Sequence, residues 1–256
     1  MNKTIQLLTV GTVLCLAACG PSQKKLAEQR EKDPQFQYDK AVVCMQYGLA
    51  DEAFKYLNEA IRLDPNHYLS FNLLGLAHMY KANPAEAVKA FTNCLVIKPD
   101  FSEAQNNLGT AYQETGQIDK AEEAFKKAYE LDRNYNASFN LARIYFDKNK
   151  LDQSLEYVQK SLDKYDRSIL AWNLKGLILE SRDKIDEAIA CYEQGLKILP
   201  GEVNISFNMG VAYYKAGRAD KAKEIMEKIL PLAKTEDLRT KINEILKRIK
   251  GRAKEV

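Results

Sequence analysis

The sequence lacks the residues and motifs that catalytic and metal sites use most often. Histidine occurs twice in 256 residues, as His67 and His78, and both lie at positions that favour packing. There is no glycine-rich phosphate loop, nucleophile elbow, zinc-peptidase helix or paired-cysteine motif. The adjacent carboxylates Glu122 and Glu123 open an expected second helix, and we interpret them as solvated. The sequence predicts a protein that is not an enzyme and needs no cofactor or metal ion.

The chain also lacks a large excess of charge of either sign. Lys and Arg number 38 against 35 Asp and Glu, which gives a net charge of +3. This balance is too weak to predict nucleic-acid binding. Basic residues gather only after Asp237, where seven of them stand against Glu244 and Glu255. We interpret residues 237–256 as a basic capping helix and tail, with contact to an anionic surface as the alternative.

A pattern of about 34 residues is present instead, and its clearest copy lies at the centre of the chain. Leu108, Gly109 and Tyr112 share one face of a predicted helix that should end near Gly116. A second apolar stripe within residues 121–128 predicts another helix, antiparallel to the first. A hairpin of this size cannot bury both of its faces alone, so it needs neighbours.

The same spacing recurs along the chain. Small residues stand at intervals of 33 or 34 at Ala41, Gly75, Gly109, Ala142, Gly176 and Gly210. Twelve residues beyond each of these lies a second small residue: Ala53, Ala87, Ala121, Ser154, Ala188 and Ala222. Sixteen residues beyond each lies a bulky apolar residue: Leu57, Phe91, Phe125, Val158, Tyr192 and Met226. Prolines follow three of the predicted second helices, at Pro65, Pro99 and Pro200.

This pattern resembles the tetratricopeptide repeat family. The resemblance implies an all-α fold, a right-handed superhelical solenoid of about six helical hairpins with a C-terminal capping helix. It covers residues 34–236, with repeats at approximately 34–67, 68–101, 102–134, 135–168, 169–202 and 203–236. Numbering each repeat so that the Gly109 position is eight gives a common frame for the residues below.

The first residues of the chain predict export. A basic start is followed by the apolar run Ile5–Ala18, which is too short to span a bilayer comfortably. The residues Leu16-Ala17-Ala18-Cys19 resemble the bacterial lipobox. The resemblance implies a lipoprotein signal peptide at 1–18 and fatty acylation of Cys19. With Gly20 next, it also implies an outer-membrane lipid anchor facing the periplasm. We interpret residues 19–33 as a lipidated tether, either extended or partly helical.

One face of the predicted first helices is a candidate groove for a partner. In this family such faces line the inside of the solenoid, at positions five, nine, twelve and thirteen of each repeat. The side chains there are too apolar for a solvated face, which predicts a contact surface. The alternative is packing against the tether helix or the end cap. The candidate residues are Tyr38, Val42, Met45, Asn72, Leu76, Met79, Tyr80, Asn106, Asn107, Thr110, Gln113, Phe139, Asn140, Arg143, Phe146, Asn173, Leu177, Phe207, Asn208, Val211 and Tyr214.

Asparagine recurs in this set. Asn72, Asn106 and Asn173 lie at position five, whereas Asn107, Asn140 and Asn208 lie at position six. The row is similar to the asparagine ladder of O-GlcNAc transferase repeats, which implies amide contacts to the main chain of an extended peptide. Adjacent helix positions differ by about 100° in direction. The alternative is that several of these amides satisfy local backbone groups between repeats.

The whole architecture resembles the type IV pilus assembly lipoproteins of the PilF/PilW type, the pilotins. This implies a membrane-anchored scaffold that binds a secretin or pilus-assembly partner in its groove, with the membrane reached through acylated Cys19 and no nucleic acid bound. One alternative is an NlpI-like adaptor for an envelope protease or cell-wall enzyme. Another is a structural scaffold of a secretion complex. The sequence leaves the oligomeric state open.

Overall fold

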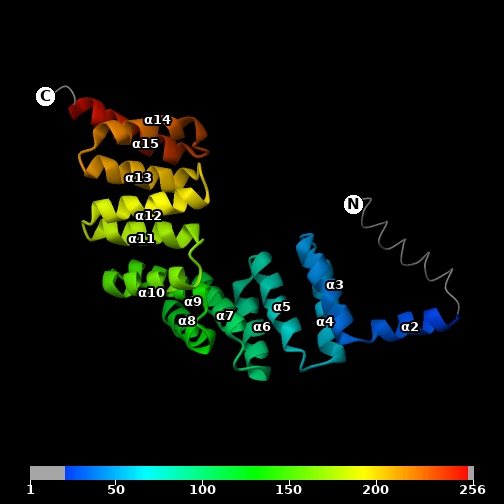
Figure 1. The fold of residues 1–256 in the computed structure, drawn as a ribbon. Coiled ribbons are helices and arrows are strands. Elements are labelled where there is room, and N and C mark those ends of the chain that lie inside the picture. Colours follow the sequence, from blue (N-terminus) through cyan, green and yellow to red (C-terminus); the bar gives the residue numbers. More distant parts are fainter. Residues whose placement is uncertain (1–20, 253–256) are drawn as a thin grey trace. The chain divides into compact units, whose positions relative to one another are not determined.

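The protein is described by a computed structural model covering residues 21–252. The predicted leader and Cys19 lie outside the described residues. The chain divides into two compact units, Met1–Ala121 and Glu122–Val256, and we describe each by itself. Every regular element within 21–252 is a helix (Figure 1). The predicted all-α fold class is confirmed.

The first unit begins with a helix that precedes the repeats and continues with paired helices. Two complete hairpins follow, each from adjacent helices joined by a short turn. The elements are α2 (Pro21–Glu31), α3 (Pro34–Gln46), α4 (Ala50–Leu63), α5 (Tyr68–Tyr80), α6 (Pro84–Ile97), α7 (Ser102–Glu114) and the start of α8 (Ile118–Asp132).

The second unit continues the pattern from within α8. Three hairpins are followed by a short 3-10 turn and a final long helix. The elements are α9 (Tyr135–Asp147), α10 (Leu151–Lys164), α11 (Ile169–Ser181), α12 (Ile185–Ile198), α13 (Val203–Lys215), α14 (Ala219–Ile229), η1 (Leu230–Leu232) and α15 (Glu236–Arg252). In chain order these are the six predicted helix pairs and the predicted capping helix.

The two helices of a hairpin meet where a small residue faces a bulky one. A methyl group added at Gly75 would overlap the buried ring of Phe91, and one added at Gly176 would overlap the buried ring of Tyr192. In the Ala41 and Leu57 pair, whose members share one core cluster, the small residue is alanine and the bulky residue is smaller than Phe91 or Tyr192. In these pairs a bulkier residue on one helix accompanies a smaller residue on the other, as close packing requires.

The turns inside the hairpins share one unusual backbone conformation. The residue seven places after the small position has φ between 55° and 75° in all six repeats. Glycine, which adopts this left-handed region without a Cβ clash, occurs at three of these sites. The other three are Ala82, Asn149 and Asp183. Each such residue ends a first helix, so hairpin geometry is set by the same local device throughout the chain.

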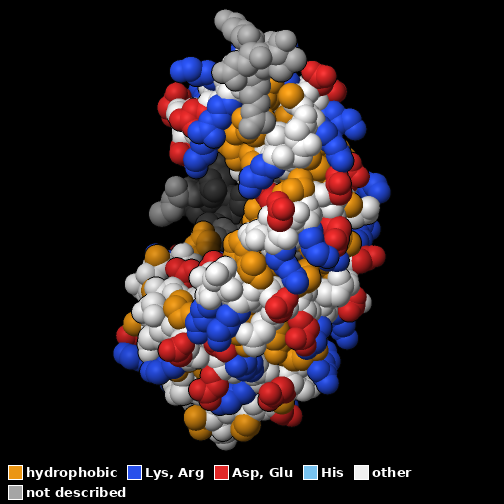
Figure 2. Space-filling view, turned by 90° about the vertical axis from the view of Figure 1, so that its left-hand side faces the viewer, with side chains coloured by type: hydrophobic (Ala, Val, Ile, Leu, Met, Phe, Trp, Pro, Cys, Tyr) orange, Lys and Arg blue, Asp and Glu red, His pale blue; other side chains and the backbone are white. Residues whose placement is uncertain are grey.

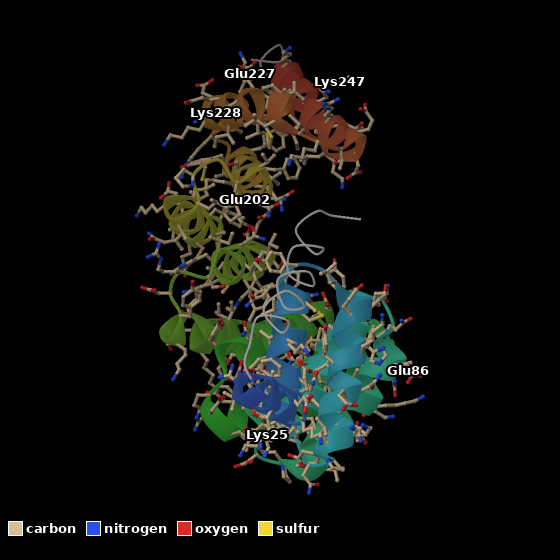
Figure 3. The ribbon with its side chains drawn as sticks, turned by 90° about the vertical axis from the view of Figure 1, so that its right-hand side faces the viewer. Lys25, Glu86, Glu202, Glu227, Lys228 and Lys247 are labelled. Carbon is tan, nitrogen blue, oxygen red and sulfur yellow. The ribbon has the colours of Figure 1, made fainter. Side chains whose placement is uncertain are left out.

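The last helix, α15, ends the stack of the second unit. It takes the place of the first helix of a seventh hairpin, and Ile242, Leu246 and Ile249 on one face are buried. Glu244 stands 34 residues after Gly210 and is exposed, so this position is not the small buried contact that it is in the six hairpins. Figure 3 shows Lys247 at this end of the chain. The exposed face of α15 carries polar and charged residues.

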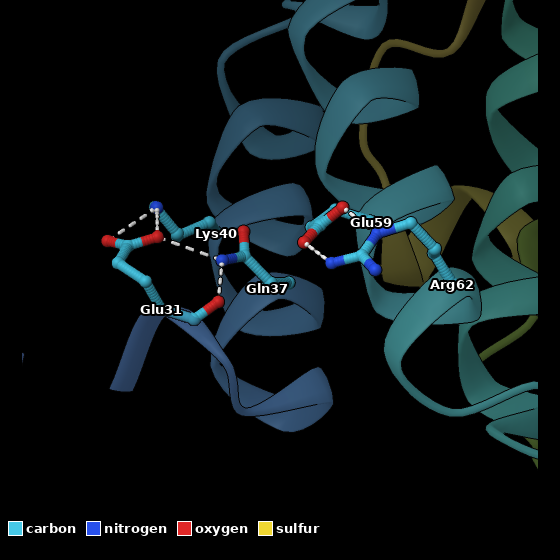
Figure 4. Close-up of polar contacts among 5 residues, drawn as sticks. All are labelled: Glu31, Gln37, Lys40, Glu59 and Arg62. Atoms are coloured by element: carbon cyan, nitrogen blue, oxygen red, sulfur yellow. Dashed lines mark hydrogen bonds and ion pairs between the residues drawn. The ribbon is translucent and has the colours of Figure 1, made fainter. Parts of the chain in front are cut away.

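The segment that precedes the repeats is helical as far as it is described. The side chain of Gln37, which is buried, donates from Nε2 to the backbone oxygen of Glu31 at 2.7 Å and to its carboxylate at 2.8 Å (Figure 4). Lys40 Nζ donates to the same carboxylate at 2.8 Å. Of the two forms proposed for residues 19–33, the described part has the helical one. No helix within 21–252 is both long and apolar enough to cross a bilayer.

We expect Gly75→Ala to destabilise the protein by about 1–3 kcal/mol, because the added methyl group overpacks against the rigid Phe91 ring. Combining it with Phe91→Leu copies the natural Ala41 and Leu57 pair and should recover part of this loss. Urea unfolding measures both. Gly251→Ala is the control, since nothing lies within 4 Å of the added methyl group. Equal losses in the single and double variants would contradict the proposed size complementarity.

Candidate functional site: the first-helix faces of the two units

In the first unit the candidate residues lie on three neighbouring helices. α3 lies beside α5, and α5 lies beside α7. We call this surface the first-helix face of unit 1. Its side chains are mostly half-buried, but Asn72 is buried and Tyr80 is 62% exposed. The residues are Tyr38, Val42, Met45, Asn72, Leu76, Met79, Tyr80, Asn106, Asn107, Thr110 and Gln113, and none of them is charged.

Some residues of this face also belong to the core. Tyr38 and Met45 pack against the buried cluster that contains Ala41, Leu57 and Ala77. Their inward parts stabilise the first hairpins, while their outward parts remain available. Substitution there would therefore change both folding and binding, whereas Tyr80 projects furthest into solvent.

In the second unit the corresponding surface is formed by α9, α11 and α13. α9 contacts α11, and α11 contacts α13. We call it the first-helix face of unit 2. It carries Phe139, Asn140, Arg143, Phe146, Asn173, Leu177, Phe207, Asn208, Val211 and Tyr214. Arg143 is exposed and the others are half-buried.

The apolar residues at the C-terminal side of this face are partly covered. Phe207 and Val211 pack against a buried cluster that includes Ile242 and Leu246 of the capping helix. This is the end-cap packing that the sequence left as an alternative. Phe146 instead packs against the cluster under α9 to α11. Phe207 and Val211 therefore share their contacts with the capping helix, whereas Phe146 packs within the hairpins.

The asparagines pair with each other between neighbouring repeats. Asn107 Nδ2 donates to Asn72 Oδ1 at 3.1 Å, and Asn208 Nδ2 donates to Asn173 Oδ1 at 2.9 Å. In both pairs an asparagine at position six of one repeat reaches position five of the preceding repeat. A regular ladder would keep every asparagine at one position of the repeat. Here the shift from position five to position six brings the two amides of each pair within hydrogen-bonding distance. Asn72 Nδ2 also donates to Glu103 Oε1 at 3.1 Å.

The Asn173 and Asn208 pair leaves hydrogen-bonding capacity on the surface, whereas Asn72 is buried and engaged at both Oδ1 and Nδ2. An asparagine amide has two N–H donors and an oxygen with two acceptor sites. Asn208 gives one N–H to Asn173, and its remaining groups can meet the main chain of a ligand. Because each pair ties two first helices together, the amides are also held in a fixed orientation before any ligand arrives, which lowers the entropy cost of binding.

A carboxylate of the second unit is neutralised within the protein. The Glu180 side chain, 10% exposed, accepts from Tyr192 Oη at 2.9 Å and from Lys215 Nζ at 2.5 Å. Burial, with the charge of Glu180, raises the pKa of Tyr192 far above its usual range. These three residues come from α11, α12 and α13, so the contact fixes the arrangement of the last hairpins.

The interpretation of Glu122 as a solvated helix start is wrong. Its side chain is 15% exposed and accepts from Lys126 Nζ at 2.7 Å, Lys148 Nζ at 2.8 Å and Tyr145 Oη at 3.0 Å. Burial by itself would raise the pKa of Glu122, but these donors outweigh it and lower the pKa to about 2. The residue is therefore a permanent anion at neutral pH and serves to join α8 to α9. Glu123, by contrast, is exposed and pairs with Lys127 at 2.8 Å.

The histidines and cysteines lie in packing positions. His67 Nδ1 is 2.8 Å from Ser70 Oγ, and the His78 ring lies 4.8 Å from that of Phe54. Burial lowers the pKa of His78. Burial also raises the pKa of the Cys94 thiol to about 12, so it is not a nucleophile at neutral pH. Among residues 21–252, no three His, Cys, Asp or Glu side chains gather to hold a metal ion.

The hairpins, the small and large residues that join them and the polar cap define a tetratricopeptide-type repeat protein. The chain belongs to the family described as "Tetratricopeptide repeat protein 21 C-terminal ARM domain", whose model matches residues 50–250. A human relative, "Protein O-mannosyl-transferase TMTC3", is 30% identical over 207 residues, which are 78% of this chain and 22% of that protein. The chain thus spans less than half of the length of the curated relatives it matches.

Two solved structures show the same fold over most of the chain. One is described as "Functional Characterization of Pseudomonas Aeruginosa pilF", with a TM-score of 0.76, 15% identity and coverage of 84% of this chain and 99% of that one. The other is "PilW, widely conserved type IV pilus biogenesis factor", with a TM-score of 0.73, 17% identity and coverage of 81% and 97%. The predicted resemblance to proteins of the PilF/PilW type is confirmed at the level of the fold.

Sequence reasoning missed several residues of these faces. Glu103 and Glu180 were not selected as site residues. Glu103 accepts a hydrogen bond from Asn72 of the preceding first helix, and Glu180 accepts one from Tyr192 of the second helix that follows it. The available signal was a spacing near one repeat: Glu103 lies 31 residues after Asn72, and Lys215 lies 35 after Glu180. Such spacings indicate contacts between neighbouring repeats.

We expect Glu122→Gln to make the protein less sensitive to acid. The depressed pKa means that Glu122 stabilises the fold above its ordinary pKa of 4.5 and that this contribution fades as pH falls toward 2. At neutral pH the substitution should cost about 2 kcal/mol, and the gap to the native protein should narrow between pH 4.5 and 2. Urea unfolding at several pH values measures this. Glu123→Gln, at the exposed neighbour, is the control. A gap that stays constant down to pH 2 would contradict the assignment.

Proposed function

We propose that this protein is a lipid-anchored scaffold of the bacterial envelope that binds an extended segment of a secretin or another pilus-assembly protein across its first-helix faces. The observation that carries the proposal is the first-helix face of unit 1. Eleven candidate residues there are uncharged, and apolar side chains stand beside the Asn72 and Asn107 pair. Non-polar surface of this kind on a soluble scaffold is typical of contact sites.

The chemistry of the face favours an extended ligand. Amides offer a donor and an acceptor to the main chain of a peptide whatever its side chains are, and Leu76, Met79 and Tyr80 offer apolar contacts to alternate side chains. Methionine adapts its shape to different partners. The proposal therefore pairs a sequence-tolerant amide row with a set of apolar subsites. It includes no chemical step, so the protein is proposed to be non-enzymatic.

The type of partner is suggested by the two pilus proteins described above. The matched region includes nearly all of the PilF and PilW chains, which supports a shared scaffold but leaves the partner to experiment. The lipobox supports the location at the outer membrane, facing the periplasm. Acyl chains contribute ~0.8 kcal/mol per buried methylene, so acylation of Cys19 would hold the scaffold at the bilayer without a membrane-binding surface on the repeats.

The partner itself can be identified by crosslinking in envelope membranes followed by affinity purification and mass spectrometry. Recovery of a secretin or pilus subunit supports the proposal. Recovery of an envelope peptidase instead would favour the adaptor alternative and overturn the pilus assignment.

We expect Met79→Glu combined with Phe146→Glu to weaken capture of the crosslinked partner by about tenfold or more, because each change places a charge in an apolar contact. The melting temperature should change little, since both side chains are only half-buried. Val96→Glu is the matched control, because Val96 is 75% exposed on a second helix. If the double variant unfolds, or if Val96→Glu weakens capture equally, the face is not the binding surface.

We expect Cys19→Ala to leave the protein folded but not acylated, so that it separates from membranes during fractionation. Metabolic labelling with a fatty-acid analogue and sedimentation of membranes measure this. Cys15→Ala is the control within the leader and should remain acylated and membrane-bound. Membrane-bound, labelled Cys19→Ala protein would rule out the proposed anchor.

A further inference from the structure

A small pocket in the second unit is lined by none of the residues of that unit's first-helix face. It has a volume of about 220 Å³ and is formed at the C-terminal ends of α8 and α10. Its lining residues are Tyr129, Arg133, Lys160, Asp163 and Lys164. Three of these five side chains are cationic and one is anionic, which gives the pocket an excess of positive charge.

Aromatic rings hold two of the cations in place. The Arg133 guanidinium lies 4.9 Å from the centre of the Tyr129 ring, and Lys160 Nζ lies 5.3 Å from it. Lys160 Nζ is also 4.5 Å from the ring centre of Tyr157, which meets Tyr129 edge to face at 5.8 Å. Cation–π attraction of this kind restricts the side chains without neutralising them.

The protein neutralises only part of this charge. Lys160 is paired with Glu156 at 2.6 Å. The one carboxylate in the lining, Asp163, accepts from Gln159 Nε2 at 2.6 Å. Among residues 21–252, neither Arg133 nor Lys164 has an ion-pair partner. Two unpaired cations therefore face one pocket.

The backbone at Arg133 has the same left-handed conformation that ends the first helices of the hairpins. Arg133 has φ of 56° and follows the end of α8, a place where glycine would avoid the cost of a Cβ. Three other repeats have proline at the equivalent position, and the repeat interval is 33 here, from Gly109 to Ala142. The negative ends of the α8 and α10 dipoles favour cations nearby.

We infer that this pocket binds the phosphate group of a phosphate monoester, with Arg133, Lys160 and Lys164 as its cationic ligands. Arginine presents a planar fork of donors that matches a phosphate, and lysine adds a compact charge. Arg133 and Lys164, which have no ion-pair partner in the described part of the chain, residues 21–252, match a dianion better than a single carboxylate when Lys160 lies beside them. The site uses second helices and a connection, so it leaves the first-helix faces free for the protein partner.

Titration calorimetry with inorganic phosphate, at constant ionic strength set with chloride, tests the site. We expect saturable binding in roughly the millimolar range, weakened about tenfold by Arg133→Gly and by Lys164→Ala. Arg133→Gly should at the same time raise the melting temperature, because glycine relieves the left-handed strain. This opposite movement of affinity and stability separates a ligand role from a structural one.

Lys221→Ala is the matched control, because Lys221 Nζ lies 5.3 Å from the ring of Tyr213 outside the pocket. The proposal is overturned if Arg133→Gly binds phosphate as the native protein does, or if Lys221→Ala weakens binding equally. Two further probes distinguish a soluble ligand from a lipid headgroup. Glycerol phosphate represents the soluble ligand, and phosphatidic acid vesicles represent the lipid, with phosphatidylcholine vesicles as the blank. If the protein binds glycerol phosphate or phosphatidic acid vesicles and Arg133→Gly weakens that binding, the site is supported. If it binds neither probe, the proposal is overturned.

Discussion

Each hairpin depends on a close approach between its two helices, made possible by a small residue that faces a bulky one. Gly75 lies against Phe91 and Gly176 against Tyr192 so tightly that a single methyl group would not fit. Where the bulky side chain is Val158, the facing residue is Ala142, and both are buried in one cluster. Since every hairpin needs a neighbour to cover its remaining faces, this spacing governs the separation of helices throughout each unit.

Polar contacts then connect one hairpin to the next. Glu122 gathers donors from α8 and α9, and Glu180 is held between Tyr192 and Lys215 of the following helices. The paired asparagines do the same on the first-helix faces. These contacts lie between repeats, where a stack of hairpins would otherwise rely on apolar surface alone. They orient the faces that the proposed partner would meet.

The proposed phosphate pocket arises where the chain departs from its own repeat. The one interval of 33 residues and the replacement of proline by Arg133 fall at the same connection. The first-helix faces, by contrast, are built from positions that every repeat has. A regular scaffold can therefore carry a broad contact surface on its repeated positions and a local site where the repeat is irregular.

The periodic residues by themselves determined the fold. A small residue, another twelve places on and a bulky residue sixteen places on could be read in six copies, because they repeat a single local geometry. The sequence also indicated which helix face carries Leu76, Met79 and Tyr80, since helical spacing fixes which side chains share a face. For the same reason it placed the asparagines of neighbouring repeats in one row.

Only the tertiary structure decided which of these residues meet. It paired Asn107 with Asn72, placed Phe207 and Val211 against the capping helix, and turned Glu122 from an expected solvated acid into the centre of a network. It also gathered Tyr129, Arg133 and Lys160 at one pocket. The reason is physical: periodicity specifies the direction of a side chain from its own helix, whereas burial, pairing and pKa depend on what the neighbouring helix brings within a few ångströms.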